Sequence, residues 1–442
     1  MYLILRNTLL YCFMFTYLVM SGDSKKCHSF YRDSKYYLST KTPYSYIANN
    51  TDDPLYFNGC SPTRIWAIIR HGTRNPGRTL VDKMRINLPA LKTIVIGHHE
   101  SEKGNLCSEV VEKLRTWVPS ADPSELKFLT HEGEEEMILL GERFQNRFLD
   151  LLPETYSNKT YKFRHTATQR ARESARSFTV GLFGRKQKAY VWYPEALAKD
   201  PILRFYKLCD KWQVEVDKNP EALKELEKFK TKPIVTRMLE NISQRIGMTN
   251  RFKFDDAKLI YQTCGFETAW HPKSPSPWCG LLSKDDFEIL EFASDLDYYW
   301  IDGYGFPINY QQACVAVNDM FQHLTDERYP QNTFYFTHSG TILKVLSYLG
   351  LYKDPQPLQA DLFNKSRLWR TSQIDAFGSN LAFILYKCKD GDKILTLHQE
   401  RPVTLPGCPE GDLCPLETLK KVYQHSINEC NFQKLCRLDR DL

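Results

Sequence analysis

Several features that mark large classes of protein are missing from this sequence. Its 59 Lys and Arg residues are spread along 442 positions, and they form no long basic run of the kind that binds nucleic acid. No Cys-x-x-Cys pair with matching His residues indicates a zinc site, and no internal repeat or low-complexity tract is present. With 42% hydrophobic and 25% charged residues, the chain is expected to be globular. Its net charge of +6 favours an anionic small molecule as ligand.

Long apolar runs are also scarce, and the clearest one lies at the start of the chain. Arg6 precedes an apolar stretch at residues 9–20, and Ser21 and Gly22 follow it. This pattern predicts a signal peptide at residues 1–22, because the alternative, a membrane anchor, needs a longer span. We therefore expect a secreted or secretory-pathway lumenal protein with no stable membrane span after signal removal. The Asn-x-Ser/Thr sequons, which predict glycosylation and fit secretion, are at Asn49, Asn158, Asn241 and Asn364.

Cysteine is not scarce, and its count fits the same compartment. Removing Cys12 with the signal peptide leaves an even number, twelve, which predicts disulfides formed in an oxidising environment. Cys264 with Cys279, and Cys408 with Cys414, are close enough in sequence to form local disulfides. The sequence does not determine the pairing of the others, Cys27, Cys60, Cys107, Cys209, Cys314, Cys388, Cys430 and Cys436.

The chain is long for one compact domain, so we expect two lobes or one domain with a large insertion. Residues 23–59 are polar and turn-rich, and they are expected to form an N-terminal arm. The main domain would then cover residues 60–442. Helical patterns within it predict a helical insertion at about residues 85–160 and 190–300, which would cap a sheet.

Regular patterns predict further elements of the main domain. Apolar residues at helical spacing predict an amphipathic helix at residues 132–152. Residues 161–164 form a short strand pattern, and a helix that begins with Thr caps is expected at residues 166–183. Residues 380–387 and 393–398 are expected to pair as antiparallel strands.

One apolar run ends in a cluster of basic residues. Residues 65–69 predict a buried strand, and Arg-His-Gly-Thr-Arg follows directly at residues 70–74. Buried strands of parallel α/β sheets carry functional residues at their carboxyl ends. Arg70 and Arg74 can grip a phosphoryl group through forked hydrogen bonds, and His71 can form a covalent phospho intermediate. The alternative is a solvated loop, but desolvating two Arg beside a His is costly without an anion.

A second strand-end motif repeats this arrangement. An aromatic run at residues 333–336 leads into Thr-His-Ser-Gly-Thr at residues 337–341, whose Ser or Thr can cap a following helix. If the two strands are adjacent and parallel, His71 and His338 face one crevice. Arg170, near the start of another helix, is a candidate third guanidinium. The alternatives are a capping or core role for His338 and an exposed charged face for Arg170.

These motifs carry a family resemblance. Arg-His-Gly-Thr-Arg-Asn-Pro at residues 70–76, with the distant His338, resembles the histidine acid phosphatase branch of the histidine phosphatase superfamily. Residues 40–44, 299–305 and 349–354 are similar to segments of the multiple inositol polyphosphate phosphatases. The resemblance covers nearly the whole mature chain. It implies an α/β fold with a mostly parallel mixed sheet, helices on both faces and an inserted helical cap.

The resemblance also implies roles for the matching residues. His71 would attack phosphorus and become a phosphohistidine, and His338 would complete the pocket. No metal or other cofactor is implied, because guanidinium groups neutralise the phosphoryl charge. The implied substrate is an anionic inositol polyphosphate, and we expect a monomer. The implied substrate-binding residues are Arg70, Arg74, Arg78 and Arg170.

One position departs from the family pattern. Relatives follow the second His with an acid, as His-Asp or His-Ala-Glu, whereas Ser339 and Gly340 follow His338 here. That acid protonates the leaving alcohol, and losing a general acid typically costs on the order of 10²- to 10⁴-fold in rate. Another carboxylate can take the role, or a neighbouring phosphate of the substrate can supply the proton. A third possibility is a weak enzyme or a binding protein.

We therefore predict a secreted phosphomonoesterase that hydrolyses inositol polyphosphates such as phytate through a phosphohistidine at His71. A broad-specificity acid phosphatase is the alternative among enzymes. A catalytically weak inositol-polyphosphate-binding protein is the alternative outside them, because Gly340 stands at the proton-donor position.

Overall fold

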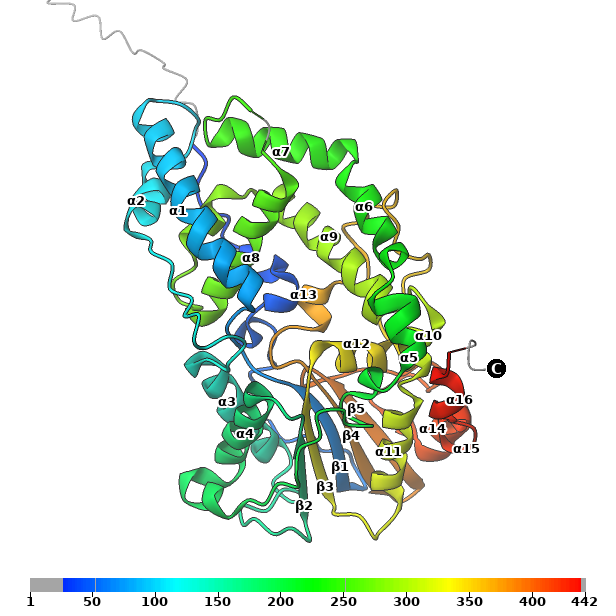
Figure 1. Cartoon of the computed structure of the whole chain (residues 1–442). Helices are drawn as coiled ribbons and strands as arrows, with labels where there is room; N and C mark the ends of the chain where they lie inside the picture. The colour runs from blue at the N-terminus through cyan, green and yellow to red at the C-terminus, as the bar shows by residue number, and fades with distance from the viewer. Residues whose placement is uncertain (1–26, 52, 251, 439–442) are drawn as a thin grey trace, which may run out of the picture.

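A seven-stranded sheet forms the centre of the molecule (Figure 1). The computed structural model describes residues 27–438 except residues 52 and 251, so the predicted signal peptide at residues 1–22 lies outside the described residues. The strands are β1 (Cys60–Arg70), β2 (Tyr161–His165), β3 (Asn332–Thr337), β4 (Asn380–Cys388), β5 (Gly391–His398), β6 (Arg401–Pro402) and β7 (Leu413–Pro415). Their order is β2-β3-β1-β4-β5-β6, and β7 pairs with β5.

Pairing directions divide the sheet into two parts. β2, β3 and β1 pair in parallel, whereas the pairs made by β4, β5, β6 and β7 are antiparallel. Only residues 389–390 separate β4 from β5, and so short a connection joins antiparallel strands. The sheet is therefore mixed, as predicted. Its parallel part is confined to three strands, however, and is not the larger part that we expected.

Both faces of this sheet are buried under helices. They are covered by α3 (His131–Arg147), α4 (Gln169–Gln187), α11 (Cys314–Thr325) and α12 (Ser339–Tyr348). Successive side chains of a strand point to opposite faces. Accordingly, Ile65, Ala67 and Ile69 of β1 join one apolar cluster with α3 and α4. Trp66 and Ile68 join the other, which includes α11 and α12. This arrangement confirms the predicted α/β class with helices on both faces.

A helical region lies beyond the carboxyl ends of β1 and β3, in the upper part of Figure 1. It contains α1 (Arg78–Glu100), α2 (Ser108–Thr116), α6 (Lys224–Lys230), α7 (Pro233–Arg245), α8 (Phe254–Trp270) and α9 (Lys284–Asp302). The α3 helix falls within the expected insertion at 85–160 but packs on the sheet instead. Its Met137, Leu140 and Phe144 are apolar and join the cluster of the β1 strand.

Shorter helices complete the described chain. They are α5 (Asp210–Trp212), α10 (Pro307–Gln311), α13 (Thr371–Ile374), α14 (Leu416–Val422), α15 (Gln424–Asn428) and α16 (Phe432–Cys436). The N-terminal arm forms short 3-10 turns and packs between the two regions. Within it, Ser39 Oγ lies 2.8 Å from Thr371 Oγ1, and the Tyr44 hydroxyl donates to Glu400 at 2.7 Å. Within the described residues, no helix has the length and apolar character needed to cross a membrane.

Several local predictions are confirmed. The expected helix at 132–152 is α3, and the expected strand at 161–164 is β2. The Thr-capped helix is α4, whose N-cap Thr168 accepts a hydrogen bond from the Ala171 backbone N–H. The expected antiparallel pair is β4 with β5.

The described cysteines form six disulfides. Cys264–Cys279 and Cys408–Cys414 confirm the two predicted local bonds. The Cys60–Cys388 bond joins the start of β1 to the end of β4. The remaining disulfides are Cys27–Cys107, Cys209–Cys436 and Cys314–Cys430.

Register sets the position of the strand ends. β1 pairs with β3 from Ile65 opposite Asn332 to Arg70 opposite Thr337. Against β4, the register of β1 shifts by one residue between Pro62 and Arg64. This irregularity lies upstream of the segment that pairs with β3.

Candidate active site

His71 and His338 are neighbours because their strands are. Each follows the last residue of a parallel strand, and those last residues, Arg70 and Thr337, lie opposite each other. The two imidazole rings have centroids 5.5 Å apart. Only 3% of His71 and 7% of His338 is exposed. The carboxyl ends of two adjacent strands therefore bring the two predicted histidines into one buried site.

Guanidinium groups surround these histidines. Arg170 comes from the first turn of α4, and its Nη2 lies 3.4 Å from Nδ1 of His338. Desolvation and the neighbouring guanidiniums lower the pKa of Arg74 to about 9 and that of Arg170 to about 10. Within the described residues, Nε of Arg70 and Nε of Arg170 are buried and have no hydrogen-bond partner. Crowded, partly unpaired guanidiniums of this kind suit an anionic ligand that offsets their repulsion.

The same positive charge keeps His71 neutral. Burial lowers its pKa well below the usual value, and Arg170 and Arg70 lower it further. Nδ1 of His71 lies 2.9 Å from the carbonyl oxygen of Gly72, which suits a proton on Nδ1. Nε2 then carries the lone pair. A neutral imidazole with a free lone pair inside a cationic site is equipped for nucleophilic attack on an anion.

His338 is oriented by groups on both of its nitrogens. Nε2 lies 2.9 Å from Oγ1 of Thr166, the residue that follows β2, while Nδ1 faces Arg170. Burial and then Arg170 and Arg204 lower the pKa of His338 well below its usual value. The ends of three parallel strands thus contribute to one site, through Thr166, His71 and His338.

The turn that carries the motif is held from behind by Glu136 of α3. Its carboxylate accepts hydrogen bonds from the Thr73 backbone N–H at 2.7 Å and from the Thr73 hydroxyl at 2.9 Å. Burial raises the pKa of Glu136 to about 7. Gly72 allows the turn to approach α3, because a Cβ there would lie 2.5 Å from the Gly133 carbonyl oxygen. Glu136 and Gly72 therefore fix the backbone on either side of His71.

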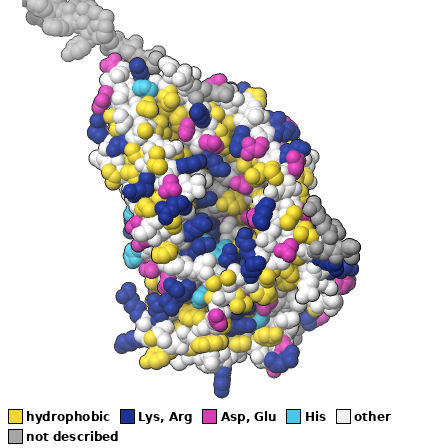
Figure 2. All heavy atoms as spheres, in the orientation of Figure 1, with side chains coloured by type: hydrophobic (Ala, Val, Ile, Leu, Met, Phe, Trp, Pro, Cys, Tyr) yellow, Lys and Arg dark blue, Asp and Glu magenta, His cyan; other side chains and the backbone are white. Residues whose placement is uncertain are grey.

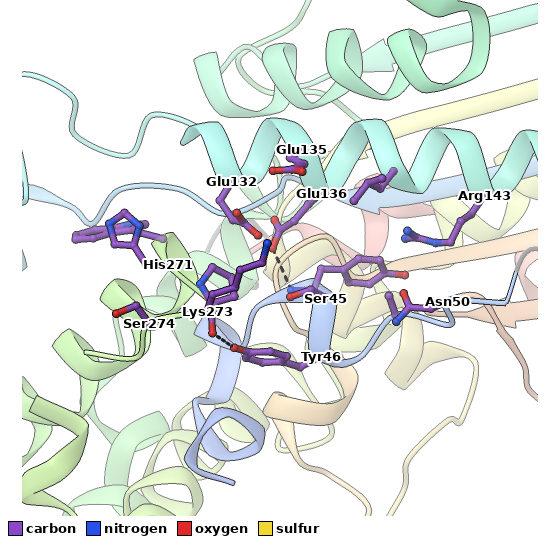
Figure 3. Close-up of a pocket in the computed structure, with 15 residues that line it drawn as sticks. Ser45, Tyr46, Asn50, Glu132, Glu135, Glu136, Arg143, His271, Lys273 and Ser274 are labelled. Carbon is purple, nitrogen blue, oxygen red and sulfur yellow. Dashed lines mark hydrogen bonds between the residues drawn. The ribbon is translucent and has the colours of Figure 1, made fainter. Parts of the chain in front are cut away.

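A separate pocket of about 630 Å³ lies on the far side of this support (Figure 3). Glu136 lines it together with Glu132 and Glu135 of α3, while Lys273 belongs to the loop after α8. In Figure 3 Glu132 and Glu136 point toward Lys273 and Ser45, whereas Glu135 lies on the other side of α3. The Tyr46 hydroxyl donates to the Pro272 carbonyl oxygen. The lining residues do not include the two histidines, so this pocket is distinct from the basic site.

The basic site itself opens toward the helical region. Figure 2 shows Lys and Arg side chains gathered around a hollow near the middle of this face, between the helical part and the sheet part of Figure 1. Arg78, expected to contact substrate, begins α1 and is exposed. Its side chain lies 4.0 Å from Asp82 and donates to the Pro123 carbonyl oxygen at 3.4 Å. The position places Arg78 farther out than the three other predicted arginines, which are buried or half-buried.

Sequence patterns do not mark three residues of the site, Arg204, Thr166 and Asp375, and they predict another role for Ser339. Arg204 lies in the range expected as an insertion, and no local pattern marks it as a neighbour of His338. Thr166 was expected only as part of a helix start. Ser339 does not cap α12, because the N-cap of that helix is His338 and no side-chain cap bond is made. Its hydroxyl donates instead to Asp375, which no sequence motif connects to the site.

Comparisons with known proteins agree with this geometry. The Histidine phosphatase superfamily (branch 2) matches residues 63–399. The chain is 32% identical over 400 residues to multiple inositol polyphosphate phosphatase 1 of Drosophila melanogaster, covering 87% of this chain and 84% of that protein.

Solved structures share the fold. A phytase from D. castellii aligns with a TM-score of 0.76 and 16% identity over 91% of this chain and 87% of its own. The Bifidobacterium longum multiple inositol polyphosphate phosphatase, in complex with inositol hexasulfate, aligns with a TM-score of 0.67 and 15% identity over 88% and 97%. The chain therefore belongs to the multiple inositol polyphosphate phosphatases of histidine phosphatase branch 2, and it is a phosphoric monoester hydrolase.

Proposed function

We propose that the protein removes phosphates from inositol polyphosphates through a phosphohistidine at His71. The observation that carries this proposal is a neutral His71, with its Nε2 lone pair available, beside His338 and surrounded by guanidinium groups. The Drosophila relative is named for inositol polyphosphates, and the B. longum neighbour was solved with inositol hexasulfate. Both support a polyanionic inositol substrate for this chain.

The reaction divides into two displacements. Nε2 of His71 attacks phosphorus, the bond between phosphorus and the alcohol oxygen breaks, and that oxygen takes a proton. Water then attacks the phosphohistidine, the bond between nitrogen and phosphorus breaks, and inorganic phosphate leaves. Arg70, Arg74 and Arg170 neutralise the oxygens of the phosphoryl group in both steps. Preorganised donors of this kind are often the largest single contribution to catalysis.

Rapid-quench labelling tests the phosphohistidine. Wild-type protein mixed with ³²P-labelled inositol hexakisphosphate should form an acid-labile phosphoenzyme, and His71→Ala should form none. His425→Ala is the matched control, because His425 is a 63% exposed surface residue paired with Glu429. It should label like the wild type. Absence of label in the wild type, or equal turnover by His71→Ala, would overturn the proposal.

A specificity comparison tests the substrate class. The ratio kcat/KM should be higher for inositol hexakisphosphate than for 2,3-bisphosphoglycerate or p-nitrophenyl phosphate. The reason is that several guanidiniums around one site can contact more than one phosphate group of the same ligand. Equal ratios for the three substrates would favour the alternative, a broad-specificity acid phosphatase.

We also propose that the protein acts in an extracellular or secretory-lumenal compartment. The six disulfides support an oxidising environment. Among the sequons, Asn158, Asn241 and Asn364 are exposed. Asn49 is half-buried, and its Nδ2 donates to the Glu400 carbonyl oxygen at 3.3 Å, so glycosylation there needs that bond to break. The expected monomeric state and the glycosylation of each sequon stay predictions.

A further inference from the structure

The start of α12 presents two small residues to the site. Ser339 and Gly340 directly follow His338 and are half-exposed. His338 itself is buried, and the centroid of its ring lies 5.5 Å from that of His71. The proposed mechanism needs a proton at the leaving alcohol oxygen, and neither side chain is a carboxylic acid. A carboxyl group from elsewhere in the fold has to reach this place, directly or through a hydroxyl.

Asp375 reaches Ser339. It follows α13 and is completely buried, with 0% exposure. The Ser339 hydroxyl donates to its Oδ2, whereas its Oδ1 is buried and has no hydrogen-bond partner among the described residues. A half-exposed hydroxyl thus connects the site to a carboxyl group that lacks the full set of donors that an ionised carboxylate needs.

The charges around Asp375 let it hold and release a proton. Arg70 faces it from β1, with Nη1 at 3.6 Å from Oδ2, and also donates to its backbone carbonyl oxygen. Asp302 of α9 and Lys41 of the N-terminal arm act on it with opposite signs. Burial dominates and raises the pKa of Asp375 to about 6, against the lowering effects of Arg70 and Ser339. The group is therefore poised between its two protonation states in mildly acidic solution.

A second carboxylate, Asp302, also lies near Gly340 but is engaged differently. A Cβ built on Gly340 would lie 3.0 Å from Asp302 Oδ1, so the carboxylate takes up the space that a side chain at 340 would need. The ammonium group of Lys344, one turn along α12 and fully buried, donates to the same oxygen. Because Asp302 is paired with the buried Lys344, it fills space and balances the charge of that ammonium group.

We propose that Ser339 and Asp375 together form the proton donor for the leaving alcohol, a proposal that rests on the function proposed above. As the bond between phosphorus and oxygen breaks, the alcohol oxygen takes the Ser339 hydroxyl proton. For this step Asp375 carries its proton on Oδ2 and donates it to Ser339 Oγ, which reverses the direction of the hydrogen bond between them, and the Ser339 hydroxyl turns to the alcohol oxygen. Ser339 takes the proton of Asp375 in the same movement, so no serine alkoxide is formed. The resulting Asp375 carboxylate faces Arg70. In the second displacement the attacking water returns a proton to Asp375 through Ser339.

The dependence on the leaving group tests this assignment. p-Nitrophenolate leaves without needing a proton, whereas an inositol alkoxide does not. Ser339→Ala and Asp375→Asn should slow phosphoenzyme formation from inositol hexakisphosphate by about 10²- to 10⁴-fold, the usual contribution of a general acid. With p-nitrophenyl phosphate, the loss should be much smaller than with the inositol substrate, because this leaving group does not need a proton. Ser339→Thr keeps the hydroxyl and should retain the rate with the inositol substrate.

Other outcomes separate the possible failures. If the variants slow both substrates equally, Asp375 only positions Arg70 and the assignment is overturned. If neither variant slows the inositol substrate, or if Asp302→Asn alone gives the selective loss, it is overturned as well. Because Ser339→Ala removes only an oxygen atom, it decides the matter even where Asp375→Asn does not fold. If wild-type protein forms no phosphoenzyme from either substrate, the function proposed above fails instead.

Discussion

The two halves of the proposed reaction are built differently in this molecule. The attacking half consists of residues at strand ends and in one first helical turn, His71, Arg70, Arg74, Arg170 and His338. The releasing half consists of Ser339 at the start of α12 and Asp375, which follows α13, and both are remote in sequence from residues 70–74. The nucleophile and anion contacts thus follow recognisable motifs at the ends of strands and the start of a helix, whereas a proton donor needs only a carboxyl group within reach and can come from a segment without a motif.

The two halves also differ in charge. Burial and then several guanidiniums lower the pKa of both histidines, which keeps them unprotonated. Asp375 has its pKa raised by burial, which keeps a proton available. Opposite shifts of neighbouring groups are a way for one site to hold a nucleophile and an acid at the same pH.

Removing one guanidinium should slow the attack on phosphorus and leave the release of the alcohol unaffected. Arg170→Ala should lower kcat/KM by about 10²- to 10³-fold, the usual cost of losing one preorganised donor to developing negative charge. The loss should be similar for inositol hexakisphosphate and p-nitrophenyl phosphate, because both transfer the same phosphoryl group. Arg172→Ala is the control, since Arg172 is exposed on the same helix and pairs with Glu173. A loss of kcat/KM confined to the inositol substrate would mean that Arg170 also contributes to release of the alcohol, which would contradict the separation of the two halves.

A smaller effect tests the packing of the releasing half. Gly340→Ala should destabilise the fold by about 1 kcal/mol, because the added Cβ would lie 3.0 Å from Asp302 Oδ1 and this carboxylate, held by Lys344, must shift to make room. Gly97→Ala in α1 is the matched control: nothing lies within 4 Å of its added Cβ, so it should stabilise slightly. Denaturant unfolding of both variants measures the difference. An unchanged midpoint for Gly340→Ala would mean that Asp302 moves freely.

The last test measures how the unfolding free energy changes with pH. Asp375 and the two histidines should change it in opposite directions. The folded-state pKa of Asp375, about 6, lies above the ordinary value of 3.8, so its contribution to stability is present below pH 3.8 and is lost as pH rises through 6. The two histidines have lowered pKa values, so their contribution is lost as pH falls below 6.5. In Asp375→Asn, the unfolding free energy should therefore rise more steeply from pH 3.8 to 6, by up to about 1.4 kcal/mol per unit. Parallel wild-type and mutant curves would contradict this.

The site could be predicted from the sequence where its residues directly follow a strand pattern or begin a helix pattern. The apolar run before residues 70–74 and the aromatic run before His338 both end in candidate site residues, and the parallel pairing of β1 with β3 brings these residues together. Arg170 was found because it opens a helix whose Thr caps are visible in the sequence. The two short-range disulfides could be predicted because their cysteines are close in sequence.

What escaped prediction depends on contacts between distant segments. Arg204 and Asp375 sit in stretches without a motif, and only folding brings them beside His338 and Ser339. The Cys60–Cys388 disulfide spans 328 residues, and no spacing rule selects such a pair. The apolar residues of α3 join one buried cluster with those of α4 and β1, so the helix packs on the sheet. Helical periodicity alone does not show which partner an apolar face will meet.

The shared register of β1 and β3 also limits how the chain can vary in length. Deleting one residue between Ile65 and Arg70 would draw His71 back by about 3.3 Å and turn its side chain to the other face. Insertions and deletions are therefore excluded from this segment, while substitutions are not. The single extra residue of β1 lies between Pro62 and Arg64, before the pairing with β3 begins. An extra residue at this entrance to the strand leaves the pairing of β1 with β3, and so the distance between the two histidines, unchanged.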